Sequence, residues 1–175
     1  MFDVFRNYYD EFLSALLEHI EISFIAIVTA IVLAIFVTIF LNFYKEFSHV
    51  TIYLFSLMYA IPSFALFALL IPITGLGQTT AIIVLVIYAQ YILVRTFLSG
   101  LSQVDKHVIE AAKAMGMTKW QILLKVQFPL AQKSFFAGLR LASTAIIAIA
   151  TIGATINAGG LGVILFDGLR TMNLT

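Results

Sequence analysis

Several residue types are scarce or absent in this chain of 175 residues. Cysteine is absent, which excludes disulfide bonds, thiolate nucleophiles and cysteine-ligated metals. Charged residues make up only 11% of the chain, whereas they make up about a quarter of an average soluble domain. The formal net charge is +1, too small to indicate a nucleic acid or another polyanion as a partner. The composition therefore excludes a soluble enzyme, a disordered tail and a nucleic-acid-binding domain.

Motifs that would give the chain its own chemistry are also missing. No Gly-Lys-Ser/Thr sequence occurs, so the chain has no P-loop for ATP. Its three histidines, His19, His49 and His107, fall at expected span ends or in loops, and none belongs to an H-E-x-x-H motif. No Ser–His pair is expected inside the membrane. We therefore predict no catalytic residue, no metal site and no cofactor bound by this chain.

Hydrophobic residues account for 62% of the chain and predict an all-α integral membrane protein, folded as a polytopic helical bundle. About 20 apolar residues cross the hydrocarbon core of a bilayer as a helix. Uncharged stretches of this length, divided by the turn-forming residues 72–80, predict four spans. These are residues 22–43, 50–73, 79–98 and 134–152. Small and polar residues after the fourth span predict a broken or re-entrant helix over 153–170.

Charge placement predicts how the spans are oriented. Residues 1–21 carry five acidic side chains against one arginine, which is not the pattern of a signal peptide. Apolar spacing within this segment favours an interfacial helix on the outer side, ahead of a single transmembrane domain over 22–175. Five of the ten Lys and Arg residues lie within 99–133. The positive-inside rule places that loop in the cytoplasm and the N-terminus outside.

The loop 99–133 is long for a connector, and its local pattern predicts two short helices. Asp105 is a candidate N-cap, Gly116 stands where a helix ends in a positive φ, and Thr118 and Gln121 form a T-x-x-Q capping box. A protruding pair of short helices is typical of a surface that binds in a groove of another protein. It also fits a surface hairpin with its lysines on anionic headgroups.

The same loop contains a longer motif. Glu110, Ala111 and Ala112 are followed by three residues and Gly116, and after nine more residues by the segment 126–129, Val-Gln-Phe-Pro. This spacing resembles the EAA loop of type I ABC importer permeases, whose pattern ends in I-x-L-P. The resemblance implies the type I permease fold and contact with an ATPase subunit. The implied ATPase-coupling residues are Glu110, Ala111, Ala112, Lys113, Met115 and Gly116.

Residues 60–77 and 152–162 resemble the osmoprotectant branch of that family, which imports glycine betaine, choline, carnitine and related solutes, with ergothioneine importers close by. The resemblance covers about residues 20–170. It implies a bacterial plasma (inner) membrane, separate ATPase subunits that bind ATP and Mg²⁺, a second permease subunit and an extracytoplasmic solute-binding protein. The second permease is either identical or homologous. Family members carry one more span, so we expect a fifth span that is missing here.

Polar or helix-breaking residues at membrane depth are candidates for a gate or a solute pathway. They can equally form hydrogen bonds with neighbouring helices. Pro62 is expected to kink the second span, while Arg95 and Arg140 are expected to snorkel to the interface. The pathway candidates are Pro62, Ser63, Gln90, Tyr91, Thr151 and Asn157.

Two other functional hypotheses compete with that of an ATP-driven osmoprotectant importer. A channel or secondary carrier would need ionisable groups buried at mid-span, and the sequence offers none. A membrane scaffold would recruit a cytosolic protein through the loop without carrying solute. Within the importer reading, another small solute such as ergothioneine remains the alternative cargo.

Overall fold

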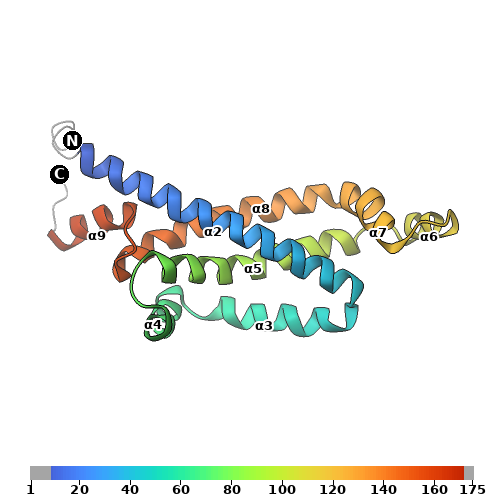
Figure 1. Ribbon diagram of the computed structural model, residues 1–175, viewed down its shortest axis with the longest axis horizontal. Coiled ribbons are helices and arrows are strands. Elements are labelled where there is room, and N and C mark those ends of the chain that lie inside the picture. The colour runs from blue at the N-terminus through green and yellow to red at the C-terminus, as the bar shows by residue number, and fades with distance from the viewer. Residues whose placement is uncertain (1–8, 172–175) are drawn as a thin grey trace.

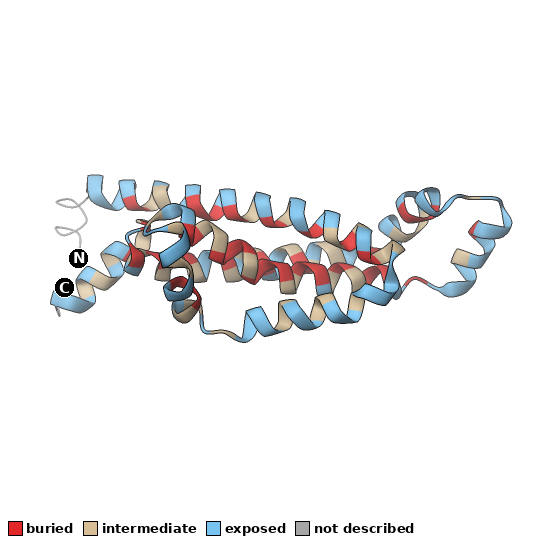
Figure 2. Cartoon of the chain, turned by 60° about the horizontal axis from the view of Figure 1, so that its bottom comes forward, coloured by how far each residue is buried: buried red, intermediate tan, exposed pale blue. Residues whose placement is uncertain are grey.

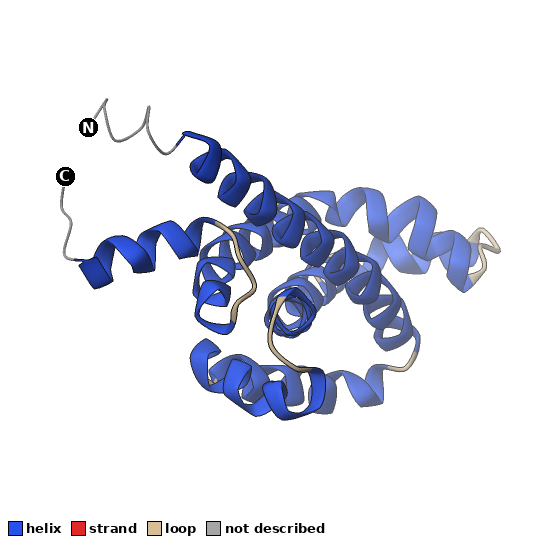
Figure 3. Ribbon diagram, turned by 60° about the vertical axis from the view of Figure 1, so that its left-hand side comes forward, coloured by secondary structure: helices blue, strands red, loops and turns tan. Residues whose placement is uncertain are grey.

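The computed structural model describes residues 9–171, and within this range the chain is helical without a strand (Figure 3). The all-α prediction is confirmed for this part of the chain. The elements in chain order are α2 (Tyr9–Phe43), η1 (Lys45–Phe47), α3 (Ser48–Ala60), α4 (Ser63–Thr74), α5 (Gln78–Ser102), α6 (Lys106–Ala114), α7 (Lys119–Ile122), η2 (Leu123–Gln127), α8 (Phe128–Ala150), η3 (Thr151–Ile156) and α9 (Leu161–Thr171).

The long helices α2, α5 and α8 run side by side along the molecule (Figure 1). At one end α6 and α7 project beyond the bundle, and α4 and α9 lie at the other end. Among the described residues, three helical segments are long and apolar enough to cross a membrane, and a fourth is present if the bent pair α3–α4 counts as one span. The expected polytopic bundle of about four spans is therefore confirmed in its outline.

Small side chains allow the three long helices to pack closely. Ala26, Ala30 and Ala34 repeat every fourth residue of α2, are 0% exposed, and form part of the core shared with α5 and α8. A Cβ atom placed on Gly100 of α5 would lie 2.5 Å from the Cβ of Ser134 in α8. Buried residues gather on the facing sides of these helices, whereas α3 has none (Figure 2). Close approach of this kind stabilises helix pairs in lipid.

The first helix differs from the prediction. Helix α2 is continuous from Tyr9 to Phe43, so the described part of the expected interfacial segment 1–21 is the first third of a longer helix. Residues 1–8 of that segment lie outside the described residues. No Gly or Pro interrupts 9–43, so nothing in the backbone ends the helix where the acidic residues stop.

The predicted second span, 50–73, is two helices rather than one kinked helix. Helices α3 and α4 are bent by 98° at Ile61 and Pro62. Ile61 is extended, with φ −67° and ψ 130°, a conformation that the following proline ring favours over the helical one. The hydroxyl of Tyr88 on α5 donates to the free carbonyl of Ile61, which satisfies the broken backbone.

The fourth span also has different bounds. The helical segment runs from Lys119 to Ile156 through the π-helical turn η2, whereas the sequence predicted 134–152. The lysines before residue 134 ended the uncharged stretch but not the helix. Beyond it the expected broken C-terminal segment is present: η3 ends at Ile156, the next residue, Asn157, has a φ of 66°, and α9 begins at Leu161.

Candidate functional site

The α6–α7 hairpin, residues 105–122, projects from one end of the bundle (Figure 1). The Asp105 carboxylate accepts a hydrogen bond from the backbone N–H of His107 at 2.8 Å. Helix α6 is followed by Gly116, whose φ is 78°. Thr118 and Gln121 form a reciprocal capping box, with donor–acceptor distances of 2.8 and 3.3 Å. The local structure that the sequence predicts for this loop is confirmed.

The six candidate coupling residues divide into two groups on this hairpin. Ala112 is only 2% exposed, and its carbonyl accepts from the N–H of Met117 at 3.1 Å. The other five residues are exposed, and Met115 is 74% exposed. Ala112 therefore holds the hairpin together, while its outer surface is formed by Glu110, Ala111, Lys113, Met115 and Gly116.

The hairpin is anchored to the long helices. Ile122 and Leu123 are buried, and Leu123 packs with Leu101 at the end of α5. The ring of Trp120 lies 4.8 Å from that of Phe43, at the last turn of α2. The base of the hairpin is therefore in contact with the ends of α2 and α5 and, through Ala131, with α8.

An aromatic cluster surrounds the break between α3 and α4. Tyr59 lies 5.7 Å from Tyr88 and 5.0 Å from Tyr91, measured between ring centroids. The Arg95 guanidinium donates to the Tyr91 hydroxyl and lies 5.4 Å from the centre of that ring. Sequence reasoning identified Tyr91 but missed Tyr59 and Tyr88. The spacing of Tyr88 and Tyr91 on one face of α5 was the available signal.

The structure does not gather all six pathway candidates in one place. Pro62 and Ser63 lie at the α3–α4 break, where Tyr59 also contacts Tyr91. Gln90 is buried, and its side-chain amide donates to the carbonyl of Ala30 at 3.1 Å, so it links α5 to α2.

The last two candidates belong to the broken C-terminal segment. Thr151 is half-buried at the start of η3, and Asn157 is exposed at its end.

Helix α2 contacts the broken segment through two adjacent polar residues. The Glu18 carboxylate accepts from the backbone N–H of Gly160 at 3.0 Å. His19 is 6% exposed, and its Nε2 lies 3.2 Å from the carbonyl oxygen of Ile147. Sequence reasoning assigned both residues to a membrane interface and did not foresee these contacts.

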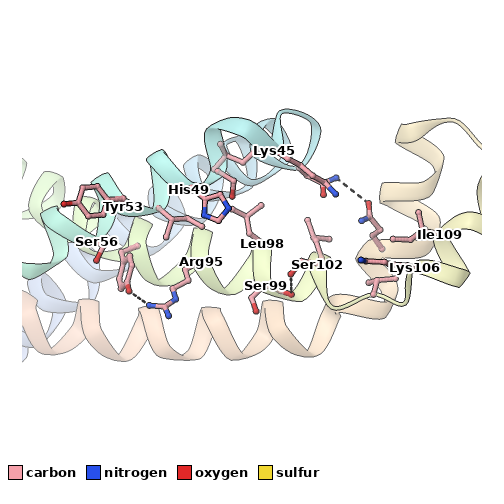
Figure 4. Close-up of a pocket in the computed structure, with 18 residues that line it drawn as sticks. Lys45, His49, Tyr53, Ser56, Arg95, Leu98, Ser99, Ser102, Lys106 and Ile109 are labelled. Atoms are coloured by element: carbon pink, nitrogen blue, oxygen red, sulfur yellow. Dashed lines mark hydrogen bonds between the residues drawn. The ribbon is translucent and has the colours of Figure 1, made fainter.

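A cavity of about 810 Å³ opens at the hairpin end of the bundle, between α2, α3, α5 and α6 (Figure 4). Its basic lining residues are Lys45, His49, Arg95 and Lys106. The region of residues 9–171 contains no group of three or more His, Asp or Glu side chains placed to hold a metal ion. No carboxylate is among the described residues that line the cavity.

Comparison with known proteins identifies the family of this chain. Residues 26–175 match the family described as binding-protein-dependent transport system inner membrane component. The chain is 38% identical over 153 residues to the carnitine transport permease protein OpuCB of Listeria monocytogenes, which covers 87% of this chain and 70% of that protein. It is 34% identical over 153 residues to the glycine betaine/carnitine/choline transport system permease protein OpuCB of Bacillus subtilis, with the same coverage.

Another relative is a longer protein. The ergothioneine transport permease/ergothioneine binding protein EgtU of Helicobacter pylori is 44% identical over 118 residues, which are 67% of this chain and 21% of that protein. The chain thus spans about a fifth of the length of that relative.

A solved structure agrees in fold. The MetNI methionine ABC transporter, in an inward-facing conformation, aligns with a TM-score of 0.81 and 22% identity, over 90% of this chain and 79% of the matched one. At this identity the likeness establishes the fold, and the expected type I importer permease fold is confirmed. The expectation of a transport component rather than an enzyme is confirmed by the family match. The chain belongs to the binding-protein-dependent transport system inner membrane components, and it is a permease subunit of an ABC importer.

Proposed function

We propose that this permease imports osmoprotectants, small quaternary amines such as glycine betaine, carnitine or choline, and that the α6–α7 hairpin couples this import to ATP hydrolysis by a separate ATPase subunit. The observation that carries the proposal is the hairpin itself. It stands beyond the bundle, is capped at both helices, and exposes Ala111 and Met115 at its tip. The solute class is supported by relatives whose names specify carnitine, glycine betaine and choline.

Coupling works in this proposal by rigid-body motion. An ATPase subunit carrying ATP and Mg²⁺ grips each hairpin, and closure of two ATPases brings two hairpins together. The small side chain of Ala111 lets the ATPase surface approach α6 closely. Because Leu123 packs on Leu101 and Trp120 on Phe43, the push reaches the ends of α5 and α2. The spans then rotate between inward-open and outward-open states, and hydrolysis resets the cycle.

The solute pathway lies between two permease subunits, identical or homologous. The aromatic cluster at the α3–α4 break supports this route, because tyrosine faces attract quaternary ammonium groups. In this proposal Pro62 and Ser63 form the moving break, Tyr91 contacts the passing solute, and Thr151 and Asn157 border the outer end. Gln90 has a supporting role, since its amide already bonds to Ala30.

The proposed orientation places the hairpin in the cytoplasm of a bacterial cell and the start of α2 outside. Five of the ten Lys and Arg residues lie in 99–133, which supports this orientation. A solute-binding protein then delivers cargo at the end that carries α4 and α9. Labelling of single cysteines at exposed Leu76 and Met115 with a membrane-impermeant reagent in intact cells tests it. The proposed topology requires labelling at residue 76 only.

A second candidate cargo is ergothioneine. The observation that favours it is the 44% identity to the Helicobacter pylori protein, the highest identity among the relatives compared above. Ergothioneine carries a trimethylammonium group and a carboxylate, as glycine betaine does, so the same aromatic cluster suits both. Competition between labelled glycine betaine and unlabelled ergothioneine separates the two cargoes.

The coupling role is tested in vesicles that contain the permease, its ATPase and its binding protein. Ala111→Trp fills the exposed face of α6, and Ala111→Ser is the matched control of small volume at the same position. We expect the tryptophan variant to lose ATP-driven accumulation while the serine variant keeps it. Persistent accumulation in a double variant, Ala111→Trp with Gly116→Pro, would show that the hairpin does not couple transport to ATP.

A further inference from the structure

The cavity at the hairpin end combines basic groups with aromatic rings. Two of its lining residues are the tyrosines Tyr53 and Tyr91. Four are basic, and none of the described lining residues carries a carboxylate: Lys45, His49, Arg95 and Lys106. Its volume of about 810 Å³ lies within the range of about 300–1,000 Å³ that is typical of small-molecule sites. The cavity therefore offers positive charge and aromatic surface to a solute, but no negative charge.

Arg95 lies deeper in the bundle than the lysines of the cavity. It belongs to α5, which is long and apolar enough to cross a membrane, whereas Lys45 and Lys106 stand at the first positions of η1 and α6. Figure 4 shows the two lysines toward the hairpin and Arg95 farther along the bundle. Ionisable residues within membrane spans almost always face the bundle interior or a cavity, and they often mark the route of a solute. Arg95 is therefore placed as a solute-binding cation would be.

The Arg95 guanidinium is held against an aromatic ring. It donates to the hydroxyl of Tyr91 and lies 5.4 Å from the centre of that ring. Tyr91 in turn lies 5.0 Å from Tyr59, measured between ring centroids. A guanidinium has five N–H groups, so donors remain beside the one that contacts the hydroxyl. The side chain is exposed within the cavity, and these donors are accessible to a ligand.

Arg95 also has no acidic partner in the described part of the chain. The ion pairs found there join His107 to Glu110 and Arg170 to Asp167. A guanidinium matches the geometry of a carboxylate, which can accept two parallel N–H bonds from it. The ligand chemistry that fits Arg95 is therefore a carboxylate.

A carboxylate acceptor beside aromatic rings describes only some of the quaternary amines. In glycine betaine one methylene group separates the carboxylate from the trimethylammonium group, so a site for it needs a cationic donor next to aromatic rings. Arg95 and Tyr91 provide that combination. Carnitine and ergothioneine also carry both groups. Choline has a hydroxyl in place of the carboxylate, so the basic cavity repels it without a compensating contact.

We propose that Arg95 is a specificity-determining residue of the solute pathway. Its guanidinium binds the carboxylate of a zwitterionic quaternary amine, while the neighbouring tyrosine rings contact the ammonium group. The permease thereby selects zwitterions such as glycine betaine over the cation choline. This inference rests on the proposed function, and it narrows the substrate class from quaternary amines in general to those that carry a carboxylate.

The test measures solute binding to the permease with its ATPase, without the binding protein, so that the selectivity of the binding protein does not enter. The complex is held in nanodiscs of phosphatidylethanolamine and phosphatidylglycerol, which contain no trimethylammonium group. Glycine betaine and choline are the probes, and saturation-transfer NMR of their methyl signals gives the two dissociation constants. The variants are Arg95→Gln and the charge-conserving Arg95→Lys. Arg140→Gln is the matched control, because Arg140 is exposed on α8 and does not line the cavity.

We expect the unaltered complex to bind glycine betaine more tightly than choline. Arg95→Gln should weaken glycine betaine binding about tenfold and leave choline binding as tight or tighter, because only the zwitterion loses a charge-assisted hydrogen bond. Arg95→Lys should keep most of the preference, and Arg140→Gln all of it. An equal loss for both solutes in Arg95→Gln would overturn the proposal, since a folding defect or a general structural role has that effect. A lysine variant as unselective as the glutamine variant would also contradict it.

Uptake measured on the same preparations separates this inference from the proposed function. The binding protein and ATP are added, and accumulation of glycine betaine is followed in vesicles. ATP-driven accumulation by a complex whose preference is unchanged in Arg95→Gln would overturn the role of Arg95 alone. An unaltered complex that neither binds nor accumulates any quaternary amine would overturn the proposed function and this inference with it.

Discussion

The carboxylate of Glu18 accepts a hydrogen bond from the backbone N–H of Gly160 at 3.0 Å, which joins the first described helix to the start of the last across 142 positions. The neighbouring Gly159 has a φ of 83°, and a Cβ there would collide with the same carboxylate. The break between η3 and α9 is thus held by an acidic side chain of α2, at the end of the bundle opposite to the hairpin.

This tie predicts a specific loss of stability. Glu18→Ala leaves the Gly160 N–H without its acceptor in a part-buried setting, which costs about 1–3 kcal/mol. Glu21→Ala is the matched control, because Glu21 is exposed on the same helix. Thermal unfolding of both variants in detergent measures the difference. Equal midpoints for the two would mean that the tie contributes nothing.

The close packing of α5 on α8 gives a second prediction. Gly100→Ala places a Cβ 2.5 Å from the Cβ of Ser134, so the helices must separate, at a cost of about 1–3 kcal/mol. Gly168→Ala is the control, because no atom lies within 4 Å of a Cβ at that position. Chemical denaturation compares the two.

A compensating change sharpens this test. Ser134→Gly in the Gly100→Ala background removes the colliding atoms and should restore part of the lost stability. A Gly100→Ala variant as stable as Gly168→Ala would contradict the packing described for α5 and α8.

The break between α3 and α4 gives a third prediction. Tyr88→Phe removes the hydroxyl that donates to the Ile61 carbonyl and leaves this carbonyl unsatisfied, at a cost of about 1–3 kcal/mol. Tyr53→Phe is the control, because that side chain is 64% exposed. The thermal unfolding midpoints of the two variants measure the difference. A larger decrease for Tyr53→Phe than for Tyr88→Phe would contradict the role of the Tyr88–Ile61 hydrogen bond.

The capping box of the hairpin gives a fourth prediction. Thr118→Val removes the oxygen that accepts from the Gln121 N–H and destabilises α7 by about 1 kcal/mol. Thr118→Ser keeps the oxygen and should behave as the unaltered chain. Hydrogen exchange of the amides in 119–122 reports the local effect. Exchange that stays slow in the valine variant would exclude a role for the cap.

The hairpin was predictable from sequence because its signals are local. Asp105, Gly116 and Thr118 each act within four residues of their own position, so a helix boundary can be inferred without knowing the rest of the fold. Pro62 likewise indicated a kink. The 98° bend was not predictable, because the Tyr88 hydroxyl that satisfies the Ile61 carbonyl at the break comes from another helix.

The burial and the hydrogen bonds of individual side chains could not be predicted, because they depend on which helix faces pack together. Ala111 and Ala112 are the same residue type at adjacent positions, yet Ala112 is buried and Ala111 is exposed in the hairpin, where α6 packs on α7 and η2. Gln90 was a pathway candidate by polarity, yet its amide points to the Ala30 carbonyl of α2. Contacts between residues this far apart are decided by the helix arrangement, which local periodicity does not specify.

Transport in a defined system tests the central claim most directly. The permease is reconstituted with its ATPase and its binding protein, and accumulation of glycine betaine, carnitine, choline and ergothioneine is measured with ATP, without ATP, and after ion gradients are collapsed. The account predicts accumulation of at least one of these quaternary amines that requires ATP and survives loss of the gradients. Accumulation that ignores ATP and stops when an ion gradient is collapsed would contradict it.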